Sequence, residues 1–151
     1  MVNAKAFYGC TALKNFRLPS YTTAIGESAF ENCEFTSFVI PEKVSSIGLA
    51  AFKNCKKLET LTFNTTVPLT ISINGTSTTG SFMGCVALKN VNLPATLTEL
   101  GKYAFYQCTG LERVTFGNTV KGSDGYYTTD AQVSGAAWDL PSWRALQTAY
   151  G

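Results

Sequence analysis

One short pattern, an aromatic residue followed three places later by a cysteine and then by an apolar segment, occurs five times along the chain. The intervals between successive phenylalanines of this pattern are 23, 22, 30 and 23 residues. A fixed period in the twenties is typical of solenoids, in which each repeat packs only on its neighbours and stacking buries a continuous core. The sequence therefore predicts a repeat solenoid, with copies of the pattern at Phe7–Cys10, Phe30–Cys33, Phe52–Cys55, Phe82–Cys85 and Phe105–Cys108.

Each copy is followed by a segment of the form apolar-x-x-apolar-x-apolar, whose last three residues alternate as a half-buried strand requires. Stacked in parallel, these segments are expected to form one sheet along one face. Three copies add a second short strand closed by Gly26, Gly48 or Gly101, where a side chain would obstruct the backbone turn. The predicted first strands cover residues 13–18, 35–40, 58–63, 88–93 and 111–116.

The period divides the chain into residues 1–117, with five repeats, and residues 118–151, a loop and a capping segment. An insertion at 64–80 interrupts the third repeat, and its alternation around Leu69 and Ile71 predicts a strand. This strand could replace the missing second strand, but a tolerated surface insertion is the favoured interpretation. The last repeat has no recognisable second strand, and residues 121–127 are predicted to be a loop. Beyond them, Asp139 is expected to cap a short helix with Pro141 in its first turn. Because an open solenoid end exposes core, this segment is expected to cover the C-terminal end.

The N-terminus begins directly in repeat register at Ala6-Phe7, which suggests a chain that lacks earlier repeats. A complete chain with a short entry segment is the alternative. The composition, 45% hydrophobic and 13% aromatic, indicates a folded chain. A net charge of +2, without any Lys/Arg run longer than Lys56-Lys57, does not support nucleic-acid binding. No apolar stretch is long enough for a membrane span, so no membrane insertion is expected.

The five cysteines do not have the spacing of a metal or catalytic site. No C-x-x-C pair occurs, and the chain has no histidine to act as a ligand or as the base for a catalytic thiol. The acidic residues are scattered over different repeats, so we expect no enzymatic activity, metal or cofactor. Each cysteine has the same place in its repeat, which predicts a buried column of free thiols. A disulfide between neighbours stays open as an alternative, because stacked repeats lie about 5 Å apart.

The residues of one repeat carry a family resemblance. Residues 47–63 read Ile-Gly-Leu-Ala-Ala-Phe-Lys-Asn-Cys-Lys-Lys-Leu-Glu-Thr-Leu-Thr-Phe, and this pattern resembles the BspA-type leucine-rich repeat of bacterial and protist surface proteins. The resemblance covers roughly residues 6–117 and not the insertion or the tail. It implies a leucine-rich-repeat solenoid, mostly β with short turns or helical corners. It also implies a cell-surface or secreted location and a non-catalytic role in adhesion or protein binding.

Polar residues between the apolar strand positions are expected to point outward in columns along the sheet. Repeat proteins commonly bind partners on such extended faces, so these columns are the candidate protein-binding surface. A structural spacer without its own ligand is the alternative, and so is a glycan-binding patch formed by Tyr126, Tyr127, Trp138 and Trp143. The candidate residues on the sheet face are Lys14, Asn15, Arg17, Ser37, Thr60, Thr62, Lys89, Asn90, Asn92, Arg113 and Thr115.

Overall fold

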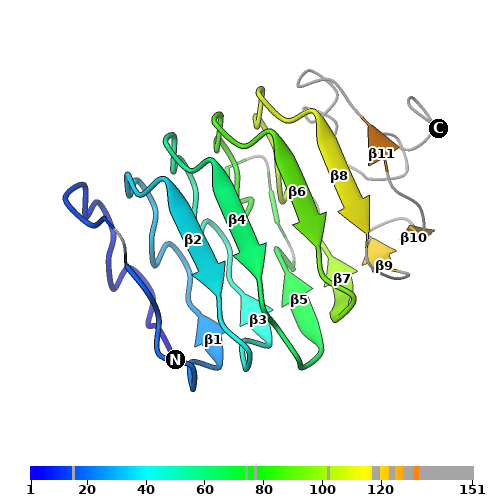
Figure 1. The fold of residues 1–151 in the computed structure, drawn as a ribbon, viewed down its shortest axis with the longest axis horizontal. Coiled ribbons are helices and arrows are strands. Elements are labelled where there is room, and N and C mark those ends of the chain that lie inside the picture. The colour runs from blue at the N-terminus through cyan, green and yellow to red at the C-terminus, as the bar shows by residue number, and fades with distance from the viewer. Residues whose placement is uncertain are drawn as a thin grey trace.

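A computed structural model describes residues 1–14, 16–73, 75–76, 78–101, 103–116, 120–122, 125–127 and 131–132. These residues form a β-solenoid whose turns follow one another along a single axis (Figure 1). Within the described part of the chain there is no helix, and so none that could cross a bilayer. The strands are β1 (Ala24–Ile25), β2 (Ser37–Ile40), β3 (Ser46–Ile47), β4 (Thr60–Phe63), β5 (Leu69–Ile71), β6 (Asn90–Leu93), β7 (Leu97–Leu100), β8 (Arg113–Phe116), β9 (Val120–Gly122), β10 (Gly125–Tyr127) and β11 (Ala131–Gln132).

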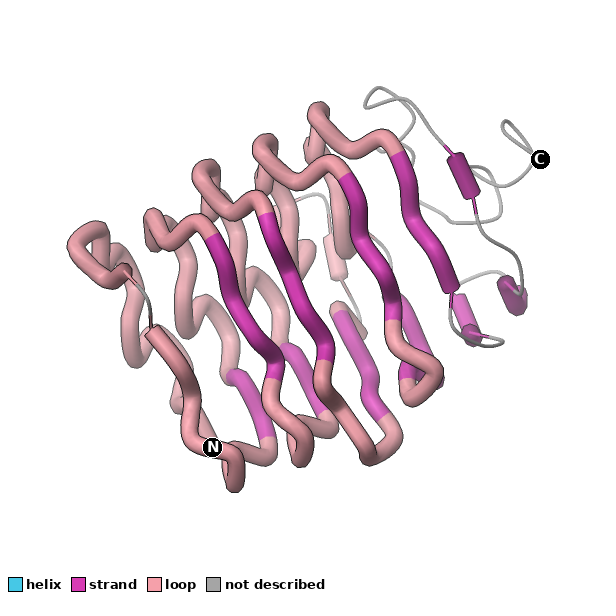
Figure 2. Tube along the Cα trace, in the orientation of Figure 1, coloured by secondary structure: helices cyan, strands magenta, loops and turns pink. Residues whose placement is uncertain are grey.

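Two strand layers run along the solenoid and are joined by turns (Figure 2). The second strands of the repeats form one six-stranded sheet in the order β1-β3-β5-β7-β9-β10. The first strands form two smaller sheets, β2-β4 and β11-β8-β6, in which β2 pairs with β4 and β6 with β8 in parallel. The predicted single sheet of first strands is therefore wrong, because it is interrupted between β4 and β6.

The predicted strand at residues 13–18 is also absent from the described residues there, 13–14 and 16–18. This segment lies at the N-terminal end of the solenoid, where it has a neighbouring turn on one side only. A strand is held in place by backbone hydrogen bonds to its neighbours, and a segment at the end of the solenoid can form these bonds on one side only. The family resemblance implies either short turns or helical segments at the corners. Every described corner is a turn, and none is a helix.

The insertion in the third repeat supplies the strand that its sequence predicted. β5 pairs in parallel with β3 on one side and β7 on the other, so it takes the place of the missing second strand. The register between β5 and β7 slips by one residue at Leu69/Thr70, which is a β-bulge. Both irregularities lie between the third and fourth turns. The bulge is in the layer of second strands, and the gap between β4 and β6 is in the layer of first strands. The insertion thus disturbs the stacking of the third turn on the fourth.

Four of the five corners turn through two residues in the left-handed region, one two places before the phenylalanine and one directly before the cysteine, and the corner at Phe82 has only the second of them. A side chain in this region costs about 1–2 kcal/mol, which glycine and asparagine reduce. The residue directly before the cysteine is glycine or asparagine in four of the five repeats. These left-handed residues are Lys5, Gly9, Ser28, Asn32, Ala50, Asn54, Gly84, Tyr103 and Gln107.

The glycines that close the second strands are needed for a different reason, the close approach of adjacent turns. A Cβ on Gly26 would lie 2.8 Å from the Ala4 nitrogen, and a Cβ on Gly101 would overlap the carbonyl oxygen of Ser72. The predicted obstruction by a side chain is therefore confirmed, and the obstructing atoms belong to the backbone of the preceding turn.

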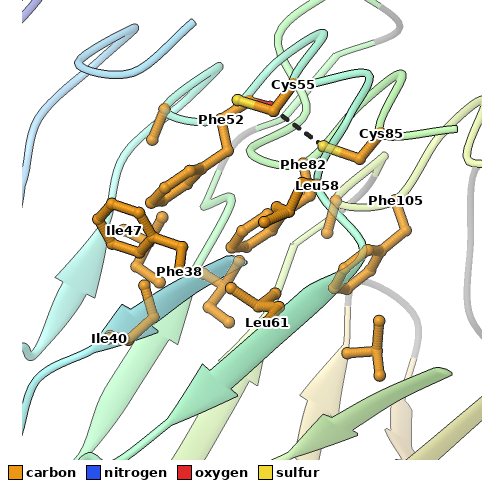
Figure 3. Close-up of a cluster of buried hydrophobic side chains, with 14 of the residues drawn as sticks. Phe38, Ile40, Ile47, Phe52, Cys55, Leu58, Leu61, Phe82, Cys85 and Phe105 are labelled. Carbon is orange, nitrogen blue, oxygen red and sulfur yellow. Dashed lines mark hydrogen bonds between the residues drawn. The ribbon is translucent and has the colours of Figure 1, made fainter. Parts of the chain in front are cut away.

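The five phenylalanines of the repeat form a stack along the solenoid axis, here called the phenylalanine stack (Figure 3 shows its central part). Neighbouring rings lie 5.0–5.3 Å apart between centroids and are nearly parallel, with interplanar angles of 2–16°. Apolar residues of both strand layers pack around it, among them Phe38, Leu58 and Ile71. The period of the sequence therefore corresponds to one continuous core, as predicted.

The C-terminal part departs from the expected loop. Residues 120–127 contain a hairpin instead, because β9 pairs in parallel with β7 and β10 pairs antiparallel with β9. β9 thus occupies the second-strand place of the last repeat, where none was recognised. On the other layer β11 is antiparallel to β8. The helix expected at Asp139 and Pro141 lies outside the described residues.

Candidate functional site

The polar columns of the first-strand layer face outward. Ser37 lies in register with Thr60, Asn90 with Arg113, and Asn92 with Thr115. Of the eleven candidate residues, Asn15 lies outside the described residues and Thr115 is half-buried. The remaining candidates are exposed, namely Lys14, Arg17, Ser37, Thr60, Thr62, Lys89, Asn90, Asn92 and Arg113.

A cleft of about 610 Å³ lies on this face where the ladder between β4 and β6 is interrupted. Its walls come from the third and fourth turns, which lie side by side in Figure 1. The cleft gathers five of the candidate residues and adds three others. It is lined by Glu59, Thr60, Leu61, Thr62, Ala87, Lys89, Asn90 and Asn92.

The side chains of the cleft offer charges and hydrogen-bonding groups of both kinds. Glu59 and Lys89, both exposed, place opposite charges on the two walls. The one ion pair among the described residues joins Lys57 Nζ to Glu34 Oε2 at 3.7 Å, away from the cleft. The charges of Glu59 and Lys89 are therefore not neutralised by an ion pair with any described side chain, and a bound partner can pair with them.

One hydrogen bond orients a side chain of the cleft. The Thr115 hydroxyl donates to Asn92 Oδ1 over 2.7 Å. This bond holds the carboxamide oxygen of Asn92, whose NH2 group is a hydrogen-bond donor. Together with the hydroxyls of Thr60 and Thr62, the cleft can recognise a polar, hydrogen-bonding partner. None of its described lining residues is aromatic.

The cysteine column is part of the core and holds no reactive group toward this face. All five thiols are free, and Cys33, Cys55, Cys85 and Cys108 are fully buried. Burial is the main cause that raises the pKa of the Cys33 thiol from 9.0 to about 11, and burial also raises that of Cys85. A buried neutral thiol is a poor nucleophile. The prediction of free, buried thiols is confirmed for these four, while Cys10 is only half-buried.

Across the described part of the chain, no three His, Cys, Asp or Glu side chains cluster as they would around a metal ion. The carboxylate of the cleft, Glu59, has no second acidic side chain beside it in the lining. The cleft can therefore bind by charge and hydrogen bonds, and its described lining residues do not supply the paired carboxylates of acid–base catalysis.

The sequence did not point to the cleft itself, nor to Leu61 and Ala87 within it; Glu59 has an outward strand position but was not among the candidate residues. The available signal was the 30-residue interval of the third repeat, which marks the place where the stacking of turns changes. The alternative glycan patch is not assembled by the described residues: Tyr126 and Tyr127 lie on β10, and Trp138 and Trp143 are outside the described part.

Comparisons with known proteins agree with this architecture. A family model, the BspA type Leucine rich repeat region, matches residues 1–77 and 75–127 in six copies. A crystal structure of a leucine-rich repeat protein from Bacteroides ovatus ATCC 8483 is similar with a TM-score of 0.68 and 34% identity, over 81% of this chain and 30% of that one. A leucine rich cell surface protein from Faecalibacterium prausnitzii A2-165 gives a TM-score of 0.51 and 24% identity, over 85% of this chain and 43% of that one. No curated protein matches the chain. The chain thus spans less than half the length of either solved relative.

Proposed function

The chain belongs to the BspA-type leucine-rich repeat family, and on this premise we propose that it is a non-catalytic binding module of a cell-surface protein. Its docking site is the polar face of the first-strand layer, centred on the cleft between β4 and β6. The partner is a protein whose surface presents both charges and hydrogen-bonding groups. The surface location rests on the family, whose members are bacterial and protist surface proteins.

The observation that carries the proposal is the cleft, because there the face of the solenoid is hollowed and five candidate residues come together. Its walls bring Glu59 and Lys89 within one site with the hydroxyls and carboxamides of the columns. Charged groups at such an exposed surface mainly set specificity and the rate of encounter. A protein partner is favoured over a glycan because the cleft lacks an aromatic ring on which a sugar could stack.

The test uses the whole chain and charge-matched variants. Binding of the biotinylated chain to arrays of purified extracellular proteins and of glycans would be compared with that of Lys89→Glu and Asn92→Ala. Lys56→Glu is the control, because Lys56 is exposed, carries the same charge and does not line the cleft. We expect a protein partner whose affinity falls about tenfold or more with the cleft variants and is unchanged in the control.

Three results would contradict the proposal. Equal binding by the wild type, Lys89→Glu and Asn92→Ala would place the docking site elsewhere. Binding of the wild type to glycans alone would favour the sugar-binding alternative, and binding to neither array would favour a spacer role.

A further inference from the structure

The first-strand layer has the same pair of hydrogen bonds at the start of each parallel ladder. Between β2 and β4, the Thr36 carbonyl accepts from the N–H groups of Glu59 and Thr60, over 2.8 and 3.2 Å. Between β6 and β8, the Lys89 carbonyl accepts from the N–H of Arg113 over 3.1 Å and from that of the preceding residue over 2.8 Å. Where two turns are paired, one carbonyl oxygen thus receives two consecutive N–H groups of the next turn.

At the cleft between β4 and β6 this pair of bonds is missing. By position in the repeat, the acceptor would be the Glu59 carbonyl, and the donors would be the N–H groups of Lys89 and Asn90. The chain enters β4, β6 and β8 in the same way, through a turn and two further residues. No described residue forms a hydrogen bond with either N–H group or with the Glu59 carbonyl. Two adjacent donors therefore point to a place where a paired turn has a carbonyl oxygen, and no described residue supplies that oxygen here.

The direction of the Asn90 N–H follows from the bond on the other side of its peptide group. The carbonyl oxygen and the N–H of a trans peptide point in opposite directions. The Lys89 carbonyl bonds to Arg113 on β8, so the Asn90 N–H of the same peptide points toward β4. Lys89 and Asn90 are exposed, and both line the cleft. A ligand in the cleft can therefore reach these donors.

The chemistry of this place favours an oxygen that carries negative charge. An exposed backbone N–H bonds to water or to a ligand, and its bond to a charged oxygen is about twice as strong as that to a neutral one. The Lys89 ammonium adds a positive charge, since it has no ion pair among the described residues. Glu59 is the one acidic residue of the described lining and balances that charge. A single carboxylate therefore fits better than a multiply charged anion such as phosphate.

We propose that the N–H groups of Lys89 and Asn90, together with the Lys89 ammonium, bind the carboxylate of an aspartate or glutamate side chain of the protein partner. This inference rests on the proposed function, because it names the side chain that the partner places in the cleft. One oxygen of the carboxylate takes the place that the carbonyl oxygen has between paired turns, and the ammonium pairs with its charge. The hydroxyls of Thr60 and Thr62 on β4 then bind polar groups beside that side chain.

The experiment follows the amide signals of Lys89 and Asn90 in ¹⁵N–¹H spectra of the whole chain. The probe is N-acetyl-glutamate N-methylamide, which carries one side-chain carboxylate and no terminal charge. The matched control probe is N-acetyl-glutamine N-methylamide, and inorganic phosphate is titrated at the same ionic strength. We expect the glutamate probe to shift these two amides saturably, and the glutamine probe to bind about tenfold more weakly, because a hydrogen bond to a charged group is the stronger one. Phosphate should also bind more weakly than the glutamate probe.

Two substitutions at one position separate the backbone donor from the side chain. Asn90→Pro removes an N–H that has no partner among the described residues, and proline is tolerated at the first residue of a strand, which Asn90 is in β6. Asn90→Ala keeps the N–H and is the matched control. We expect the proline variant to weaken binding of the glutamate probe about tenfold, and the alanine variant to leave it unchanged.

Lys89→Gln tests the charge and keeps both N–H groups, so it decides the matter if Asn90→Pro does not fold. It should weaken binding about threefold or more, because a charge-assisted contact is lost. Equal binding of the two probes, no saturable shift at the Lys89 and Asn90 amides, or unchanged binding in Lys89→Gln would overturn the proposal.

These titrations need no partner protein, so their outcome is separate from that of the proposed function. A protein partner that loses affinity with Lys89→Glu and Asn92→Ala, while the glutamate probe leaves the Lys89 and Asn90 amides unshifted, would uphold the docking face and overturn the carboxylate site. The site would stand and the docking function would fail if the probe shifts both amides but no protein on the array binds.

Discussion

Replacing Phe52 by alanine tests whether the phenylalanine stack holds the turns together. Phe52 is fully buried and lies between Phe30 and Phe82, at 5.3 and 5.0 Å between ring centroids. It also meets Phe38 edge to face at 4.9 Å. Truncating a buried phenylalanine costs about 3–5 kcal/mol, and aromatic pairs add about 0.5–1.5 kcal/mol each. We expect Phe52→Ala to lower the free energy of unfolding by about 5 kcal/mol, a large part of the ~5–15 kcal/mol of an ordinary domain.

Phe7→Ala is the matched control, since Phe7 has the same position in its repeat but is only half-buried at the end of the stack. Its expected cost is about 2 kcal/mol, because less apolar surface is removed from the core. Urea unfolding followed by far-UV circular dichroism measures both values. Equal losses for the two variants, or a loss below about 2 kcal/mol for Phe52→Ala, would refute the view that stacking between turns dominates the core.

Three further outcomes are expected. Gly101→Ala should lower the free energy of unfolding by more than about 3 kcal/mol, because the Cβ of the new alanine would overlap the Ser72 carbonyl oxygen. Gly9 has open space around it, so in the same urea titration Gly9→Ala should lower the free energy of unfolding by only about 1 kcal/mol. In native protein Ellman's reagent should react quickly with Cys10 alone, and a Cys10→Ala variant that still reacts quickly would contradict the burial of the other four thiols. The free energy of unfolding should fall as the pH rises from 9.0 to about 11, because the unfolded Cys33 thiol loses its proton at lower pH than the folded one. The fall should be smaller in Cys33→Ala, and it should disappear well below pH 9.0, where the thiol is protonated in both states.

The core could be predicted from the sequence because every turn puts the same position in the same surroundings. Once Phe30 and Phe52 were in register, the stacking of their rings and the burial of the cysteines followed. The outward direction of Thr60 and Asn90 followed from strand alternation in the same way. The strand in the insertion could be predicted too, since Leu69 and Ile71 alternate with polar residues.

The cleft could not be predicted, because it depends on how far one turn is displaced relative to the next. That displacement accompanies the interruption of the ladder between β4 and β6, and no single residue of the sequence signals it. Some left-handed corners were also hidden: Asn32 and Asn54 favour that conformation, whereas Ala50 and Tyr103 adopt it without any preference of their own. The hairpin β9-β10 was missed because its strands are short and contain glycine, which is uncommon in strand interiors.

The phenylalanine stack is continuous across the insertion. Phe52 and Phe82 are 30 residues apart in the sequence, yet their rings lie 5.0 Å apart at an angle of 7°, like those of the regular turns. The Cys85 thiol likewise reaches the Phe52 carbonyl over 3.1 Å, as in its neighbours. The interior therefore tolerates a change of loop length that reshapes the outer face. Evolution of new recognition surfaces in such a protein requires no redesign of its interior, because insertions between turns alter the surface while the inherited packing is retained.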